Sequence, residues 1–163
     1  MKHTLSLVLI FSFLWTPLAA AAVRGKSARY VGGTVAVFKA AVDGTWEMAD
    51  KALVFTAEKD GVKVSIPYNK IKSLEYGQKV GRRLGGAMAG ALIVHPVFLL
   101  LLFSKKRKHF VTIEFLDETG KKQGAVFELA KGIVKESLTT LESKSGKEVK
   151  YESDEAKEHL EKQ

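Results

Sequence analysis

The residues that could carry out chemistry are few, and they form no recognisable catalytic or metal-binding pattern. The chain has four histidines and no cysteine. No two histidines stand at metal-ligand spacing with a carboxylate on an expected helix, and no serine has the context of an activated nucleophile. No carboxylate pair stands out for acid–base work. The lack of cysteine excludes a disulfide framework, a Cys-based metal site and a thiol nucleophile. We therefore expect no enzyme activity, no cofactor and no metal.

His95 is the histidine with the most unusual surroundings, because it lies inside an apolar run from Leu84 to Phe103. An ionisable side chain at membrane depth is a candidate functional group. The plainer interpretation is that a neutral imidazole satisfies a carbonyl freed by the bend at Pro96. Both interpretations stay open at this point.

The apolar run is the most distinctive segment of the chain. It has 20 residues and no formal charge, which is the length that a helix needs to cross a hydrocarbon core of about 30 Å. The run predicts membrane attachment and makes a transmembrane helix an expectation. The side chains expected to enter the membrane are those of Leu84, Leu92, Ile93, Val94, Val97, Phe98, Leu99, Leu100, Leu101, Leu102 and Phe103.

Basic residues bracket this run and form the candidate binding surface. Each Lys or Arg close to an anionic membrane contributes about 1 kcal/mol of attraction, so the cluster fits phospholipid headgroups or an acidic protein partner. The alternative is that it only marks membrane topology. Nucleic acid is not expected as a partner, because stacking aromatic residues are not interleaved with the basic ones. The candidate lipid- or partner-binding residues are Arg82, Arg83, Lys105, Lys106, Arg107 and Lys108.

The N-terminus and the overall charge indicate a compartment. Residues 1–22 have a short positive start, an apolar stretch and four alanines before Val23, as in a cleavable signal peptide. An uncleaved anchor is the alternative. The formal net charge of +8 suits anionic partners. We expect an exported protein attached to the bacterial cell envelope, on the periplasmic side of the inner membrane.

Alternating apolar residues predict six or seven antiparallel strands. The clearest hairpin joins 53–57 to 62–66 through a turn that contains Gly61. A glycine pair at Gly32 and Gly33 predicts a bulge or a close backbone approach, whereas a phosphate-binding loop lacks the lysine that should follow. The remaining strands are expected at 30–37, 45–48, 71–76, 110–116 and 124–129.

After the strands the period changes to that of a helix. Val134, Leu138 and Leu141 fall at i, i+4 and i+7, which predicts one helix over about 132–144 with Gly146 as its stop. Residues 146–163 are charged and poor in core-forming side chains, so we expect a flexible or marginally helical tail. Residues 23–28 are expected to be a loose leader.

This order of elements, together with several short motifs, resembles the pleckstrin-homology-like superfold and its GRAM-type relatives. The resemblance covers about residues 28–145. It implies a mainly β fold with a C-terminal α-helix, in which a bent antiparallel sheet or partial barrel is closed at one end by the helix. Residues 29–145 would form this domain, with an apolar helical insertion, 84–103, between two strands. The segments that carry the resemblance are 66–68 with 71–74, and 112–113 before the turn at 117–120.

Three further segments, 30–34, 74–77 and 103–107, are similar to a group of uncharacterised exported bacterial proteins. The superfold includes lipid-binding, peptide-binding and purely structural members, so the resemblance implies no single function.

The insertion divides the expected sheet, which constrains its path. Strands ending near Gln78 and starting near His109 should be neighbours, so both ends of the run should emerge on the same side of a membrane. A bend at Pro96 would give a hairpin whose arms, about 16 Å and 10 Å long as helices, reach into one leaflet. The alternatives are a type I protein with one crossing and a soluble insertion packed on the sheet or a partner.

The sequence therefore favours an exported, membrane-associated, non-catalytic binding or scaffold module that docks through an apolar hairpin and a basic cluster. The alternative is a single-pass or structural envelope protein. Its apolar run would associate with another helix through the small residues of 86–90.

Overall fold

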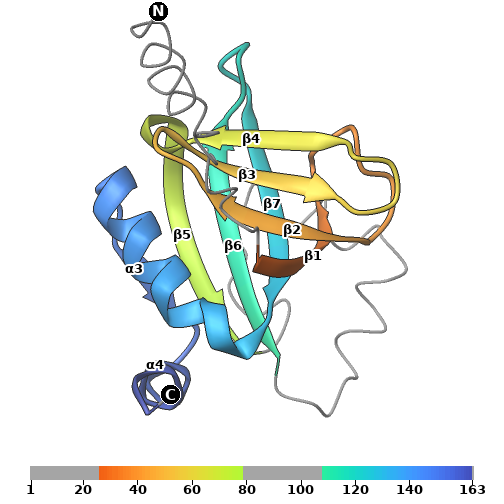
Figure 1. Cartoon of the computed structure of the whole chain (residues 1–163). Helices are drawn as coiled ribbons and strands as arrows, with labels where there is room; N and C mark the ends of the chain where they lie inside the picture. Colours follow the sequence, from red (N-terminus) through yellow and green to blue (C-terminus); the bar gives the residue numbers. More distant parts are fainter. Residues whose placement is uncertain (1–25, 79–107, 163) are drawn as a thin grey trace, which may run out of the picture.

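The computed structural model describes residues 26–78 and 108–162, which form one eight-stranded sheet and its helices (Figure 1). The strands are β1 (Lys26–Gly33), β2 (Val42–Met48), β3 (Ala52–Ala57), β4 (Lys63–Pro67), β5 (Ile71–Gly77), β6 (His109–Leu116), β7 (Lys122–Leu129) and β8 (Val149–Tyr151). The helical elements are the 3-10 turns η1 (Tyr68–Lys70) and η2 (Lys131–Ile133) and the α-helices α3 (Val134–Ser145) and α4 (Asp154–Glu161).

The strand order is β4-β3-β2-β1-β7-β6-β5-β8. Neighbouring strands are antiparallel except β5 and β8, which are parallel, so the sheet is mixed and does not close into a barrel. Figure 1 shows β2–β4 running crosswise to β5–β7, so the sheet is strongly bent. The expected mainly β fold with a C-terminal helix is confirmed.

Aromatic side chains from both halves of the bend meet in the core. The ring of Phe127 in β7 lies 5.0 Å from that of Trp46 in β2 and 5.2 Å from that of Phe55 in β3. Helix α3 adds Leu138 and Leu141 to this cluster, which confirms the predicted apolar stripe. Aromatic pairs at such distances stabilise the core beyond the area they bury, so the bent sheet and α3 enclose one continuous apolar centre.

Two glycine predictions are also confirmed. The register of β1 against β7 shifts between Tyr30 and Gly32, which is the expected bulge. A Cβ on Gly33 would overlap the carbonyl oxygen of Gly124. Gly146 ends α3 in the left-handed conformation, with φ of 66°, and its N–H donates to the carbonyl of Glu142.

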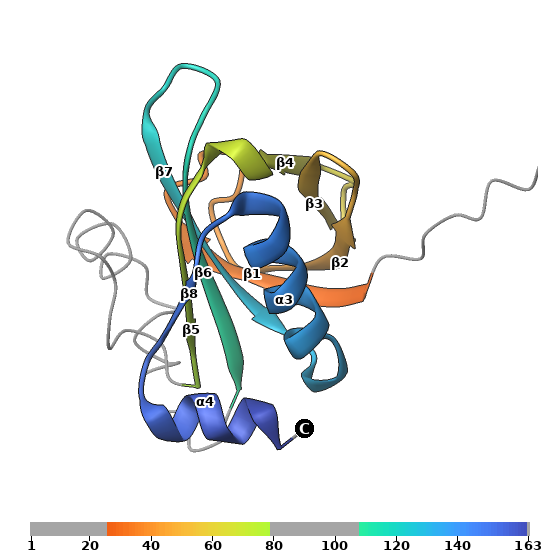
Figure 2. The ribbon, with the colours of Figure 1, turned by 90° about the vertical axis from the view of Figure 1, so that its left-hand side faces the viewer.

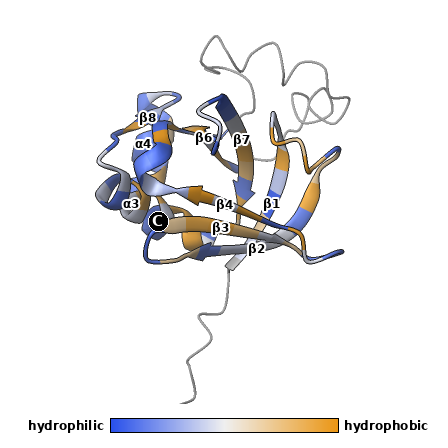
Figure 3. Cartoon of the chain, turned by 90° about the horizontal axis from the view of Figure 1, so that it is seen from above, coloured by the Kyte–Doolittle hydropathy of each residue, from blue (hydrophilic) through white to orange (hydrophobic). Residues whose placement is uncertain are grey.

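The charged C-terminal segment differs from the expectation of a flexible tail. Strand β8 extends the sheet beyond β5, and α4 follows it. Val149, Ala156 and Leu160 are buried in the core cluster, although α4 is coloured mostly hydrophilic in Figure 3. Three apolar side chains among many charges are too few for a clear periodic pattern, yet each one is buried. Residues 26–28, expected in a loose leader, belong to β1.

The expectation of a transmembrane helix is wrong for the structure as described. No helix within residues 26–78 and 108–162 is long and apolar enough to cross a membrane. Pairing of β5 with β6 also argues against a single crossing between them, because the two strands would then lie on opposite sides of the bilayer. Residues 1–22, the run 84–103 with His95, and Arg82, Arg83, Lys105, Lys106 and Arg107 lie outside the described residues.

Candidate functional site

The candidate site is the place where the chain leaves the sheet for the apolar run and returns from it. We call it the base of the insertion and define it as residues 76–78 at the end of β5 and 108–110 at the start of β6. Gly77 is paired with Phe110, and Tyr76 with Val111. The prediction that these two strands are neighbours is confirmed. The chain therefore leaves the sheet and returns to it at the same end of two neighbouring strands.

Lys108 is the one member of the expected basic cluster that the structure describes. Its Nζ donates to Oε2 of Glu128 in β7 at 2.9 Å. Their side chains are only 27% and 22% exposed, so the pair is shielded from water more than a surface salt bridge is. Lys108 thus joins β6 to β7 at the base, rather than projecting freely toward a partner.

A buried tyrosine–histidine pair stiffens the base. Oη of Tyr76 lies 2.7 Å from Nδ1 of His109, and the two rings are stacked with centroids 6.0 Å apart. Burial raises the pKa of Tyr76 to about 12, although a hydrogen bond with Gln78 opposes the rise. Burial also lowers the pKa of His109, and His159 and Lys131 lower it further against the opposing Glu128. With the phenol protonated and the imidazole neutral, the O–H donates to Nδ1 in the tautomer that carries its proton on Nε2.

Strand β8 and helix α4 cover the Tyr76–His109 pair on one side. The ring of His159 in α4 stacks on that of His109 with centroids 6.3 Å apart. Tyr151 in β8 packs edge-on against Tyr76 at 5.9 Å. The N–H of Glu152 donates to the carbonyl of Tyr76 at 2.8 Å. The end of β5 is therefore held both by β6 and by the segment after β8.

Glu152 also fixes the first residue beyond β5. Its Oε2 accepts the N–H of Gln78 at 2.9 Å. A Cβ on Gly77 would lie 2.7 Å from the same oxygen, so glycine at that position makes room for the carboxylate. Pairing with β6 and the bonds to Glu152 thus hold the end of β5 in place, although Nε2 of Gln78 is buried without a hydrogen-bond partner among the described residues.

Sequence reasoning missed β8 and α4, which complete this site. One local pattern could have revealed α4: Ser153 caps the helix, its side chain accepting the N–H of Ala156, and acidic residues follow in the first turn. Serine at the N-cap and acids in the first turn are typical of a helix start. Ala156 and Leu160, four residues apart, then supply the buried side.

Within the described ranges, no group of three or more His, Cys, Asp and Glu could hold a metal ion. The base can instead position an attached segment. The paired ends of β5 and β6 fix the two positions at which that segment leaves the sheet and returns to it.

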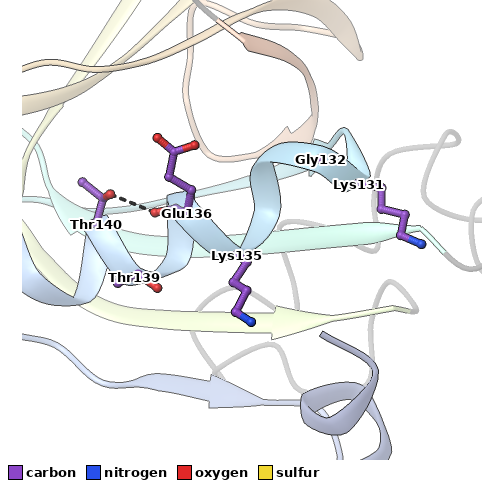
Figure 4. A pocket seen from close by; sticks show the side chains of 6 residues that line it. All are labelled: Lys131, Gly132, Lys135, Glu136, Thr139 and Thr140. Carbon is purple, nitrogen blue, oxygen red and sulfur yellow. Dashed lines mark hydrogen bonds between the residues drawn. The ribbon is translucent and has the colours of Figure 1, made fainter. Parts of the chain in front are cut away.

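A separate hollow of about 650 Å³ lies along η2 and the outer side of α3 (Figure 4). In that view the side chains of Lys131, Lys135 and Glu136 point in different directions. Binding pockets need polar groups that converge on one ligand, so we do not assign a site there. Its lining residues are Lys131, Gly132, Lys135, Glu136, Thr139 and Thr140.

Comparisons with known proteins do not assign a function. No protein-family model matches the chain, and no curated protein matches it significantly.

Proposed function

We propose that this protein is an exported, non-catalytic binding or scaffold module that docks on the periplasmic side of the bacterial inner membrane. The apolar run 84–103 enters one leaflet as a hairpin, and the basic residues on either side contact anionic headgroups. We further propose that the domain has the pleckstrin-homology-like superfold. A bent sheet of seven antiparallel strands followed by α3 supports this assignment, whereas β8 and α4 are additions to it.

One observation carries the proposal: Gly77 is paired with Phe110 at the base of the insertion. An apolar segment whose ends are held together must leave and return on the same side of a bilayer. Arms shorter than the hydrocarbon core meet this condition, and Pro96 is placed where the two arms would join.

Charge supports the same orientation. Arg82 and Arg83 precede the apolar run, and Lys105, Lys106 and Arg107 follow it. With the feet of the hairpin fixed side by side at the base, both basic groups face one headgroup layer. The free energy of their attraction to anionic lipid then adds to the free energy gained when the apolar side chains leave water.

Vesicle flotation of the full chain tests the proposal. Vesicles that contain phosphatidylglycerol are compared with vesicles of phosphatidylcholine alone. We expect binding to the first, weakened by salt because exposed charges are screened. Replacing Lys105, Lys106 and Arg107 by Gln removes about 3 kcal/mol of attraction, which corresponds to a roughly hundredfold weaker binding.

The matched control removes the same number of charges from the other half of the sheet. Lys51, Lys59 and Lys63 are exposed around β3 and β4, and their replacement by Gln should change binding little. Equal losses in the two triple variants would show that only the net charge matters. Failure of the unaltered chain to float with either vesicle would overturn the proposed function.

A further inference from the structure

The sheet carries a second apolar surface, separate from its core. Val31, Phe110 and Val126 are only 1%, 6% and 1% exposed, yet none of them belongs to the core cluster. Every other buried apolar side chain in the described ranges does. These three residues are therefore buried against something other than the core.

Strand register places two of them on the face opposite the core. Val111 and Ile113 in β6 belong to the core, and successive side chains of a strand point to opposite faces. Phe110 and Thr112 consequently lie on the outer face. Val126 in β7 is the cross-strand partner of Thr112 and shares that face. We call this surface, formed by Phe110, Thr112 and Val126, the outer patch.

The described helices do not cover the outer patch. Leu138 and Leu141 of α3 pack into the core on the inner face, and α4 lies at the end of the sheet beside β8 (Figure 2). Thr112, only 9% exposed, marks the middle of the patch. Gly77 beside Phe110 and Gly124 beside Glu114 add no side chains of their own to this face, and the side chain of Glu152 occupies the space over Gly77.

We propose that the outer patch is the docking surface of the chain's own apolar run, 84–103, when the protein is away from a membrane. The positions at which this segment begins and ends favour it over any other occupant. The chain departs after Gly77 and returns before Phe110, which is itself part of the patch. A helix of 20 residues is about 30 Å long, and the eight residues of β6 extend about 26 Å. The run can therefore lie along the patch without any change in the sheet.

Charge complementarity supports the same occupant. Glu75, Glu114 and Glu128 alternate with core residues in β5, β6 and β7, so their carboxylates lie on the outer face around the patch. The run is flanked by basic residues at both ends, at 82–83 and 105–108. One contact of this kind is present already, because Lys108 pairs with Glu128. An apolar centre with an acidic rim matches an apolar segment with basic ends.

The inference deepens the proposed function and rests on it in one respect: the bilayer and the outer patch compete for the same apolar run. In water the patch shields the run, which would otherwise expose a large apolar surface. Lipid binding then requires the run to leave the patch. A weaker patch should therefore make membrane binding tighter.

Docking in the absence of lipid is tested by a spin label. The chain has no cysteine, so Ala89→Cys provides one attachment point inside the run. We expect strong paramagnetic broadening of the amide signals of Thr112 and Val126. The amides of Thr45 and Val54, on the outer side of β2 and β3, should keep most of their intensity. Equal broadening at both pairs, or none at either, would overturn the inference.

Competition is tested by a matched pair of variants. Thr112→Lys places a charge in the outer patch, and Thr56→Lys places the same charge on the outer side of β3, with circular dichroism and thermal unfolding as checks of the fold. We expect several-fold tighter binding of Thr112→Lys to phosphatidylglycerol vesicles and little change for Thr56→Lys. Equal binding of the two would overturn competition even if the unaltered chain floats. Loss of all flotation with the broadening intact would instead support docking and remove the proposed function.

Discussion

The hydroxyl of Tyr76 and Nδ1 of His109 are 2.7 Å apart inside the sheet, one residue before the chain leaves β5 and at the first residue of β6. This buried hydrogen bond joins the two feet of the insertion. Because both groups are shielded from water, the protonation state of His109 affects the stability of the base.

The first prediction concerns pH. The pKa of His109 is lowered by burial, then by His159 and Lys131, against the opposing effect of Glu128. The unfolded chain therefore binds a proton more readily than the folded one, and stability rises with pH in this range. We expect the free energy of unfolding to fall as the pH drops below about 6.5, the ordinary value for histidine. Urea unfolding at pH 7.5 and 5.0 measures the difference.

The control for this pH effect is His109→Gln, which removes the titrating group and keeps a polar side chain. Its unfolding free energy should change less between the two pH values than that of the unaltered protein. An unchanged pH dependence in this variant would assign the effect to other groups.

The second prediction concerns the other partner of the same bond. Tyr76→Phe leaves the buried Nδ1 of His109 without its hydrogen-bond partner, which costs about 1–3 kcal/mol of stability. Tyr151→Phe is the matched change, because Tyr151 is half-buried beside the Tyr76 ring; its cost should be within about 0.5 kcal/mol. Chemical denaturation of both variants compares them. Similar losses of stability in the two variants would mean that the Tyr76 hydroxyl contributes no more than the Tyr151 hydroxyl.

The third prediction concerns space at the end of β5. In Gly77→Ala the new Cβ would lie 2.7 Å from Oε2 of Glu152. We expect the carboxylate to move and to lose its bond to the N–H of Gln78, at a cost of about 1 kcal/mol. Gly132→Ala is the control, because nothing lies within 4 Å of its Cβ position; this change should be neutral or slightly stabilising. Thermal unfolding of the two variants gives the comparison.

The β-hairpins and α3 could be predicted because their side chains repeat at the period of the element. Leu53, Phe55 and Ala57 alternate along β3, and Val134, Leu138 and Leu141 form one side of α3. Short-range periodicity is the strongest structural information in a single sequence. The rule that consecutive strands are neighbours also predicts that the two ends of the insertion lie close together.

The candidate site was harder to predict, because long-range contacts create it. In the sequence, His109 is only a histidine that follows a basic cluster, and nothing local pairs it with Tyr76 or stacks His159 upon it. The ion pair of Lys108 with Glu128 likewise joins residues on different strands. Strand β8 has three residues, too few to show any alternation.

The last prediction tests whether the C-terminal segment is structural, as the strand and helix indicate. Ending the chain after Gly146 removes the buried side chains of Val149, Ala156 and Leu160, and full burial of a valine or leucine stabilises by about 1.5–3 kcal/mol each. It also opens the Tyr76–His109 pair to water. We expect the unfolding free energy to fall by several kcal/mol and the pH dependence assigned to His109 to weaken.

A shorter truncation provides the control for this experiment. Removing only Lys162 and Gln163 leaves every buried residue of α4 in place, so stability should be unchanged. If the chain ending at Gly146 were as stable as the full chain, the segment would be a dispensable tail. The base would then be held by β6 alone.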